Sequence, residues 1–88
     1  MRLEFSPEAW EHYLTNAEEG VTIAKPNGLL QEIKRDPFRG TGKPEPLKGN
    51  LSGYWSRRIT REHRLVYRVY TEDEIQRCYV LSCRFHYD

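Results

Sequence analysis

The sequence predicts an α+β domain in which two N-terminal helices pack on an antiparallel sheet. Its 88 residues are enough for one compact domain but not for two, so we expect two layers around a single core. Apolar residues recur at helical spacing in the first part of the chain, whereas three later segments alternate between apolar and polar side chains. These two periodicities indicate helices followed by strands.

The chain begins with a weak strand signal followed by a clearer helix signal. Leu3 and Phe5 alternate with polar residues, which favours a short strand. The run Ser6-Pro7-Glu8 is typical of a helix start, because serine caps the first turn, proline fits its first position and an acidic side chain complements the helix dipole. Apolar residues then continue at helical spacing as far as Gly20, so we expect a helix from about residue 7 to 19.

A second helix is predicted by the apolar stripe of Leu29, Leu30 and Ile33, and it should end at Asp36-Pro37. The run Pro26-Asn27-Gly28 interrupts this helix signal. Proline inside a helix removes a hydrogen bond and clashes with the preceding turn. We therefore expect the second helix to be kinked near residue 26 or to begin only at about residue 27.

The second half of the chain is predicted to be a long loop followed by three strands. Residues 39–53 are rich in glycine and proline and are interpreted as a loop. The expected strands cover residues 54–59, about 63–70 and about 75–86, with two polar turns between them. Two consecutive turns of this kind indicate an antiparallel meander.

Alternation along the last two strands assigns each side chain to one of two faces. In the middle strand, Arg64, Val66 and Arg68 share the face opposite Leu65, Tyr67 and Val69. In the last strand the two sets are Tyr79, Leu81, Cys83 and Phe85, and Val80, Ser82, Arg84 and His86. We expect the apolar faces to pack on the helices, leaving a second face on which Arg64 and His86 meet.

The charge is unevenly distributed along the chain, although the net charge is only +1. Residues 34–68 hold ten basic and three acidic side chains, whereas the segments before and after them carry a net negative charge. Tyr54, Trp55 and Tyr67 lie within this basic segment. The pattern indicates a phosphate-rich partner, and the alternative is a solvated, charged face of the sheet.

The sequence carries no signal for a membrane or a secreted protein. No apolar run is long enough to cross a bilayer, and the N-terminus lacks the apolar core of a signal peptide. Cys78 and Cys83 are expected to lie on opposite faces of one strand, about 16 Å apart, which excludes a disulfide between them. We therefore expect a cytoplasmic protein with no membrane partner and with both thiols free.

The chain contains two highly specific runs, Gly42-Lys43-Pro44-Glu45-Pro46-Leu47-Lys48 and Ser52-Gly53-Tyr54-Trp55-Ser56-Arg57-Arg58. They are supported by Glu62-His63-Arg64-Leu65-Val66-Tyr67 and Cys83-Arg84-Phe85-His86-Tyr87. With these runs the chain closely resembles the YoeB-type toxins of the RelE superfamily, over nearly its whole length and most strongly from residue 36 to 67. Two features depart from the family pattern: Pro26-Asn27-Gly28 within the second helix, and Asp88 beyond the terminal His-Tyr pair.

The resemblance implies a single RelE/YoeB-like toxin domain over residues 1–88, with a twisted antiparallel sheet similar to that of microbial ribonucleases. It implies the toxin of a type II toxin–antitoxin system that cleaves mRNA in the ribosomal A site and inhibits translation. The implied partners are the ribosome, mRNA and a YefM-type antitoxin, and homodimers occur in the family. No cofactor or metal is expected, because the 2′-hydroxyl of RNA is an internal nucleophile.

Three residues on matching motif positions are the candidate catalytic groups. Such a reaction needs a base for the 2′-hydroxyl, a cation for the developing phosphorane charge and an acid for the leaving 5′-oxygen. Glu45, Arg64 and His86 supply these roles in that order. The alternatives are a solvated surface glutamate, an arginine that only pairs with Glu62 or Asp73, and an incidental terminal histidine.

Five further residues are carried over from the family as RNA-binding or supporting groups: Lys48, Arg57, Arg58, Glu62 and Tyr87. Tyr87 would stack on a base or position the phosphate. Trp10, Trp55 and Tyr67 are interpreted as core residues. A non-catalytic inhibitor that only binds the ribosome or RNA, and a domain that only binds its antitoxin, remain alternative functions.

Overall fold

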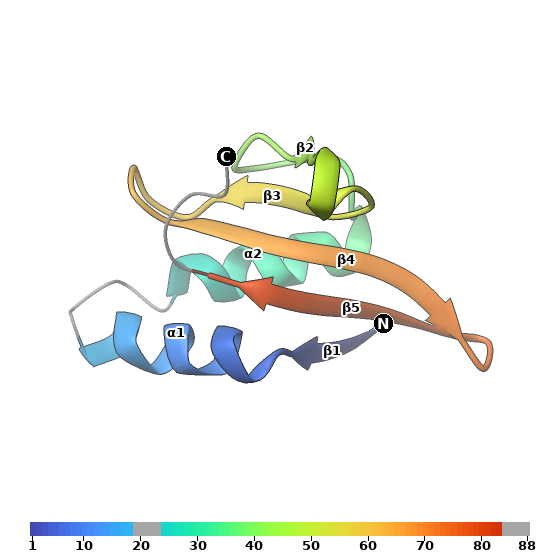
Figure 1. Cartoon of the computed structure of the whole chain (residues 1–88), viewed down its shortest axis with the longest axis horizontal. Coiled ribbons are helices and arrows are strands. Elements are labelled where there is room, and N and C mark those ends of the chain that lie inside the picture. The colour runs from blue at the N-terminus through green and yellow to red at the C-terminus, as the bar shows by residue number, and fades with distance from the viewer. Residues whose placement is uncertain (19–23, 84–88) are drawn as a thin grey trace.

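The computed structural model describes residues 1–18 and 24–83, which form a five-stranded sheet and two helices (Figure 1). The helices are α1 (Pro7–Glu18) and α2 (Ala24–Arg35), and a single 3₁₀ turn covers Gly49–Leu51. The strands are β1 (Arg2–Phe5), β2 (Glu45–Pro46), β3 (Trp55–Arg58), β4 (Arg64–Glu72) and β5 (Ile75–Ser82). The predicted α+β fold class is confirmed.

The sheet has the order β1-β5-β4-β3-β2. Strands β3, β4 and β5 form the predicted antiparallel meander, and β2 adds an antiparallel edge. Strand β1 instead lies parallel to β5, so the sheet is mixed rather than wholly antiparallel. Alternation identifies the first strand but not its partner, because that partner is the last strand of the chain. Of the strand predicted over residues 75–86, the part from residue 84 onward lies outside the described residues.

Ser6 caps α1, as its sequence context predicts. Its Oγ accepts a hydrogen bond from the Ala9 N–H at 2.9 Å, and its hydroxyl donates to the carbonyl of Leu81 at 2.7 Å. The same side chain therefore starts the helix and fixes it to β5. The prediction that Trp10 is a core residue is wrong, because its side chain is 49% exposed and stacks on Tyr13 at the surface. A helix on the surface buries only one stripe of its side chains, and that stripe includes Ala9.

Helix α2 covers Ala24–Arg35, so the expected start at about residue 27 is wrong, whereas the alternative of a kink near residue 26 stays a prediction. Pro26 occupies the first turn of the helix. The first four N–H groups of a helix have no partner within it, so a proline there removes no hydrogen bond. The predicted end is confirmed: Arg35 is the last helical residue, and the Asp36 N–H still donates to Glu32 at 2.8 Å.

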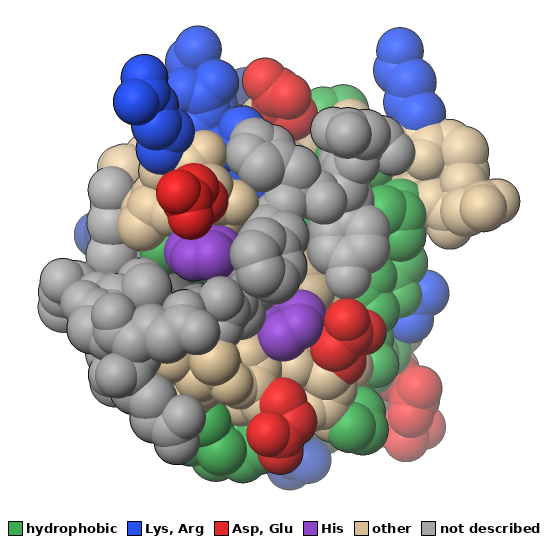
Figure 2. Space-filling view, turned by 60° about the vertical axis from the view of Figure 1, so that its left-hand side comes forward, with side chains coloured by type: hydrophobic (Ala, Val, Ile, Leu, Met, Phe, Trp, Pro, Cys, Tyr) green, Lys and Arg blue, Asp and Glu red, His purple; other side chains and the backbone are tan. Residues whose placement is uncertain are grey.

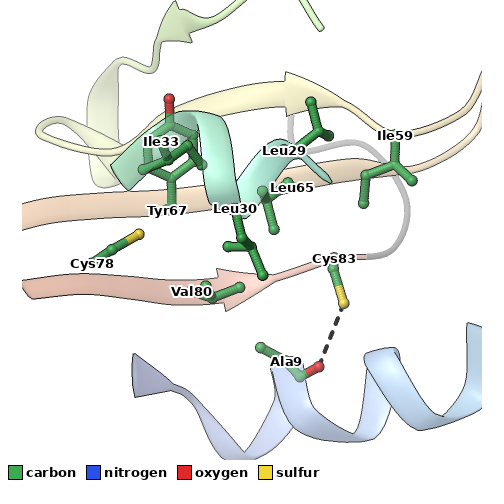
Figure 3. Packing of buried hydrophobic residues seen from close by; sticks show 10 residues of the cluster. All are labelled: Ala9, Leu29, Leu30, Ile33, Ile59, Leu65, Tyr67, Cys78, Val80 and Cys83. Carbon is green, nitrogen blue, oxygen red and sulfur yellow. Dashed lines mark hydrogen bonds between the residues drawn. The ribbon is translucent and has the colours of Figure 1, made fainter. Parts of the chain in front are cut away.

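The hydrophobic core lies between the two helices and one face of the sheet (Figure 3). It contains Ala9 from α1, Leu29, Leu30 and Ile33 from α2, and Ile59, Leu65, Tyr67, Cys78, Val80 and Cys83 from the second half of the chain. Cys78 and Cys83 are not joined in a disulfide, and burial raises the pKa of the Cys78 thiol to about 12. The core contains the apolar residues predicted for α2 and for β4, but the face expected for β5 is wrong. Cys78 and Val80 point into the core, whereas Tyr79 lies opposite Arg68 on the other face.

A bulge at Leu81 reverses the alternation of side chains along β5. Tyr67 lies opposite Val80 and Val66 lies opposite Ser82, so one residue of β5 has no counterpart on β4. As a result Cys78 and Cys83 both point into the core, and the expectation that they lie on opposite faces is wrong. For the same reason Val80 and Ser82, which simple alternation assigns to one face, lie on opposite faces.

The turn between β4 and β5 holds two non-glycine residues in the left-handed region. Asp73 and Glu74 have φ values of 52° and 65°, a conformation that costs an L-residue about 1–2 kcal/mol. We therefore expect Glu74→Gly to raise the free energy of unfolding by about 1 kcal/mol, measured by urea denaturation. Gln76→Gly, two residues away in β5, is the control and should lower that free energy, because glycine weakens a regular strand. A loss of stability in both variants would contradict the strain argument.

Candidate functional site

The candidate site lies on the outer face of the sheet, defined here as the face turned away from the core. The strand register places a row of side chains across this face, from Glu45 on β2 through Ser56 and Val66 to Ser82 on β5. The next row contains Arg58 opposite Arg64. Adjacent strands lie about 4.8 Å apart, so these side chains from four separate segments share one small area.

Glu45 belongs to a two-residue edge strand that the sequence analysis assigned to a loop. Its side chain is exposed, and its backbone is held opposite Ser56 by pairing of β2 with β3. Two further bonds anchor the flanking chain: the Leu47 N–H donates to Tyr54 at 2.9 Å, and the Arg58 N–H donates to Gly42 at 2.7 Å. The available signal was Pro44-Glu45-Pro46 itself, because prolines in a sheet are confined to edge strands.

Gly42 allows the segment that leads to Glu45 to lie against β3. Its φ is +87°, and a Cβ at this position would come within 2.9 Å of the Arg58 carbonyl oxygen. Any other residue would push this segment away from β3 and lengthen the hydrogen bond from the Arg58 N–H. The backbone that carries Glu45 is therefore fixed relative to the backbone that carries Arg58.

Arg64 is a cation whose charge is not neutralised within the described part of the chain. Its Nη1 atom is buried and has no hydrogen-bond partner there, and no ion pair joins it to Glu62 or Asp73. Arg58 faces it directly across the strand pair, although like charges in this position repel each other. The buried Oγ of Ser82, in the neighbouring row, also lacks a partner in the described residues. An anion bound here would satisfy these groups together.

Arg57 has a structural role, in contrast to its neighbour Arg58. Its side chain is 0% exposed and points into the helix side of the sheet. Its guanidinium donates to the Tyr67 hydroxyl at 3.1 Å and to the carbonyls of Asp36, Arg39 and Thr41 at 2.9, 2.8 and 3.3 Å. Of the two roles expected for Arg57, substrate contact and support, the geometry leaves only support.

A carboxylate and a phenol complete the surroundings of this guanidinium. Glu32 approaches Arg57 at 3.8 Å, and its pKa is lowered chiefly by the hydrogen bond that its carboxylate accepts from the Thr41 N–H. The Tyr67 hydroxyl donates to the Pro37 carbonyl at 2.6 Å, and burial raises the pKa of this tyrosine. Hydrogen bonds to Arg57 and Tyr67 thus hold the segment between α2 and β2 against the helix side of the sheet.

The remaining predicted site residues are dispersed. Lys48 is exposed at the start of the 3₁₀ turn, and Glu62 is exposed in the turn between β3 and β4. His86 and Tyr87 lie outside the described residues. The expected meeting of His86 with Arg64 and the expected role of Tyr87 in stacking on a base or positioning the phosphate therefore stay predictions. The described chain ends beside α1, where the Cys83 N–H donates to His12 Nδ1 at 3.4 Å.

Sequence reasoning missed a row of polar and aromatic side chains on the outer face. The guanidinium of Arg68 lies 5.7 Å from the ring centre of Tyr54 and 4.8 Å from that of Tyr70. The Tyr70 hydroxyl donates to Glu4, which also accepts from Arg77 at 3.1 Å. The bond from Tyr70 lowers the pKa of Glu4 and raises the pKa of Tyr70 itself. The alternation of Arg64, Val66, Arg68 and Tyr70 was the available signal.

The surface reflects the uneven charge of the sequence. Figure 2 shows Lys and Arg side chains projecting from the upper part of the molecule, where β2 and β3 lie in Figure 1, and acidic side chains both among them and lower down. Neither helix in residues 1–18 and 24–83 is long and apolar enough to cross a membrane. Within the same ranges, no three His, Cys, Asp or Glu side chains converge as they would around a metal ion.

A separate shallow depression of about 310 Å³ lies at the C-terminal end of α2. It is lined by Glu32, Arg35, Asp36, Arg39 and Gly40. Basic and acidic side chains are mixed there, and none of the candidate catalytic residues contributes to it. The depression therefore belongs to the helix side of the molecule and not to the candidate site.

Comparison with known proteins identifies the family of this chain. Residues 5–87 match the model of the YoeB-like toxins of bacterial type II toxin–antitoxin systems. The toxin YoeB of Escherichia coli strain K12 is 52% identical over 88 residues, covering 99% of this chain and all of that protein. A YoeB/ParE toxin from Agrobacterium tumefaciens has a similar structure, with a TM-score of 0.90, 49% identity and coverage of 99% of this chain and 100% of the other.

Two structures from Staphylococcus aureus record assemblies of such toxins. A YoeB dimer and a YoeB–YefM complex each match with a TM-score of 0.82, at 44% and 43% identity, over 99% of this chain and 98% of theirs. The motifs, the fold and these relatives agree along the whole chain. The protein therefore belongs to the YoeB-like toxins and is the toxin of a bacterial type II toxin–antitoxin system.

Proposed function

We propose that this toxin is an endoribonuclease that cleaves mRNA in the ribosomal A site, using the 2′-hydroxyl of the message as the nucleophile. The observation that supports this most strongly is the pair of arginines on the outer face. Arg58 and Arg64 lie opposite each other, and the Nη1 of Arg64 is buried without a partner among the described residues. This arrangement suits a phosphate group and has no evident structural purpose. Glu45 lies on the same face, two strands from Arg64.

The proposed reaction is a transesterification within the message. Glu45 accepts the proton of the 2′-hydroxyl, and the 2′-oxygen forms a bond to phosphorus. The guanidinium of Arg64, assisted by Arg58, stabilises the charge that develops on the non-bridging oxygens. The bond from phosphorus to the 5′-oxygen then breaks, and His86 protonates that oxygen. The products carry a 2′,3′-cyclic phosphate and a 5′-hydroxyl, and no other reactant is consumed.

A message with a single 2′-deoxy nucleotide tests this mechanism. With the toxin and ribosomes programmed with that message, we expect cleavage to be lost when the 2′-hydroxyl is missing on the 5′ side of the scissile bond. A 2′-deoxy nucleotide one position further away is the matched control and should be cut at the normal rate. Cleavage of the first message at an unchanged rate would rule out the mechanism and the roles of Glu45 and His86.

A second modified message tests the proposed role of His86 as the acid. A sulfur atom in place of the 5′-oxygen leaves readily without a proton, so His86→Ala should be much less harmful on this message than on the normal one. If the toxin binds programmed ribosomes and stops translation without cutting either message, it acts instead as a non-catalytic inhibitor.

We further propose the partners of this chain from its relatives. The complex and the dimer from Staphylococcus aureus support a YefM-type antitoxin as the cognate partner and a homodimer as a second assembly. The basic outer face suits an acidic antitoxin segment that would neutralise Arg58 and Arg64. The ribosome and its message place the proposed activity in the cytoplasm.

A further inference from the structure

Arg68 lies between two tyrosine rings on the outer face, apart from the proposed cleavage centre. Its guanidinium approaches the rings of Tyr54 and Tyr70 at 5.7 and 4.8 Å. Arg68 is exposed, and both tyrosines are half-buried. No carboxylate of the described residues forms an ion pair with Arg68, so its contacts leave a positive charge and its N–H groups available at the surface.

The stack is held in place by residues of β1 and β5 on the same outer face of the sheet. The Tyr70 hydroxyl donates to Glu4 on β1, and Glu4 is fixed in turn by Arg77 on β5 at 3.1 Å. Tyr54 is tethered by its backbone, because its N–H donates to Leu51 and its carbonyl accepts from Leu47, each at 2.9 Å. The two rings are therefore ordered before any ligand arrives, which lowers the entropic cost of binding.

The stack lies on the same strand and the same face of the sheet as Arg64 of the proposed cleavage centre. Arg64, Val66 and Arg68 are alternate residues of β4 and share the outer face. Four residues of a strand span about 13 Å, so Arg68 is too distant to contact the phosphate held at Arg64. A nucleotide chain whose phosphate is held at Arg64 would reach Arg68 if it continued along β4. Exposed guanidinium and aromatic planes beside a phosphate site are the groups on which unpaired bases stack.

We propose that Tyr54, Arg68 and Tyr70 form a stacking subsite for one unpaired base of the message that flanks, but does not adjoin, the cleaved bond. This inference rests on the proposed function for its substrate, a single RNA strand. Stacking accepts any base, because every base has a π-face. The subsite therefore contributes to holding the message rather than to choosing a sequence.

The test measures binding of a short, fluorescently labelled, unpaired RNA that carries a 2′-deoxy nucleotide at the scissile position. One abasic nucleotide is moved along this RNA, one position at a time. For the unaltered toxin, we expect one flanking position at which loss of the base weakens binding roughly tenfold. For Arg68→Ala and Tyr54→Leu, the intact RNA should bind about as weakly as that abasic RNA, and the abasic change at this position should have no further effect.

Two variants serve as controls. Arg35→Ala removes the same charge from the exposed end of α2, on the helix side of the sheet, and should keep the sensitivity to the abasic position. Tyr70→Phe keeps the ring but loses the bond to Glu4, so it should bind better than Tyr70→Leu. Circular dichroism and thermal unfolding establish that each variant is folded.

The outcomes separate this inference from the proposed function. If the toxin fails to cut messages on ribosomes but shows the Arg68-dependent abasic position, the cleavage proposal fails and the subsite stands. If binding depends on no single base, or if Arg68→Ala behaves like Arg35→Ala, the subsite is ruled out even though cleavage occurs. If the Arg68 and Tyr54 variants lose only antitoxin binding, the stacking subsite is also ruled out. Tyr54, Arg68 and Tyr70 would then serve the protein partner and not the message.

Discussion

Replacing Arg64 with alanine is expected to lower the single-turnover rate of message cleavage by about 10²–10³-fold. The proposed transition state concentrates negative charge on the phosphate. Arg64 is half-buried on the outer face, and its buried Nη1 atom has no hydrogen-bond partner among the described residues. Arg64→Lys should recover only part of the rate, because lysine keeps the charge but not the planar fork of donors. Cleavage is measured on programmed ribosomes with the toxin in excess.

Stability measurements distinguish this catalytic loss from simple unfolding. Arg64 lies opposite Arg58, so its removal relieves a repulsion and should leave the melting temperature unchanged or slightly higher. Arg35→Ala, at the exposed end of α2, is the matched control and should cleave at the normal rate. A normal rate in Arg64→Ala would remove the central element of the proposed mechanism. A lower rate that only follows a lower melting temperature would make Arg64 a structural residue.

Replacing Arg57 with alanine is expected to lower the free energy of unfolding by about 3–5 kcal/mol, the cost of breaking a buried charged network. The change leaves the carbonyls of Asp36, Arg39 and Thr41 without their donor, and each unsatisfied buried group costs about 1–3 kcal/mol. Arg57→Lys should rescue little of this loss, because one ammonium group cannot reach acceptors arranged around a planar fork. Urea denaturation measures both variants.

The adjacent residue supplies the control. Arg58 is exposed on the other face of β3, so Arg58→Ala should change the free energy of unfolding by no more than about 0.5 kcal/mol. The same change should weaken RNA binding and reduce its dependence on salt, because one phosphate contact is lost. Equal destabilisation by the two alanine substitutions would show that the face on which each arginine lies does not decide its role.

Local signals were reliable where the physical cause is local. The cap at Ser6, the end of α2 at Arg35 and the meander of β3, β4 and β5 follow from neighbouring residues alone. Pro26 misled the prediction because proline has different consequences in the first turn and in the interior of a helix. The sequence does not mark where the first turn begins, so the position of Ala24 as the start could not be read from it.

Alternation failed at the one point where the strand itself is irregular. The bulge at Leu81 changes which side chains of β5 face the core, and it moves Cys83 to the same face as Cys78. A bulge depends on how two strands pair and not on the composition of either one. Arg64 and His86 would share a face only if alternation continued unbroken along β5, and the bulge removes that condition. His86 now rests on the family motif alone.

The sequence by itself determined the class of fold, the core residues of α2 and β4 and the motifs that mark the family, because periodicity and motif are properties of the chain in order. Only the tertiary structure decided which arginine serves which purpose. Arg57 and Arg58 are adjacent and chemically identical, yet Arg57 is buried on the helix side of β3 and Arg58 is exposed on the outer face. Strand geometry sends successive side chains to opposite faces, but packing of the helices decides which face is covered. Burial makes the guanidinium of Arg57 a structural link, whereas the guanidinium of Arg58 stays exposed, where we propose that it binds an anion.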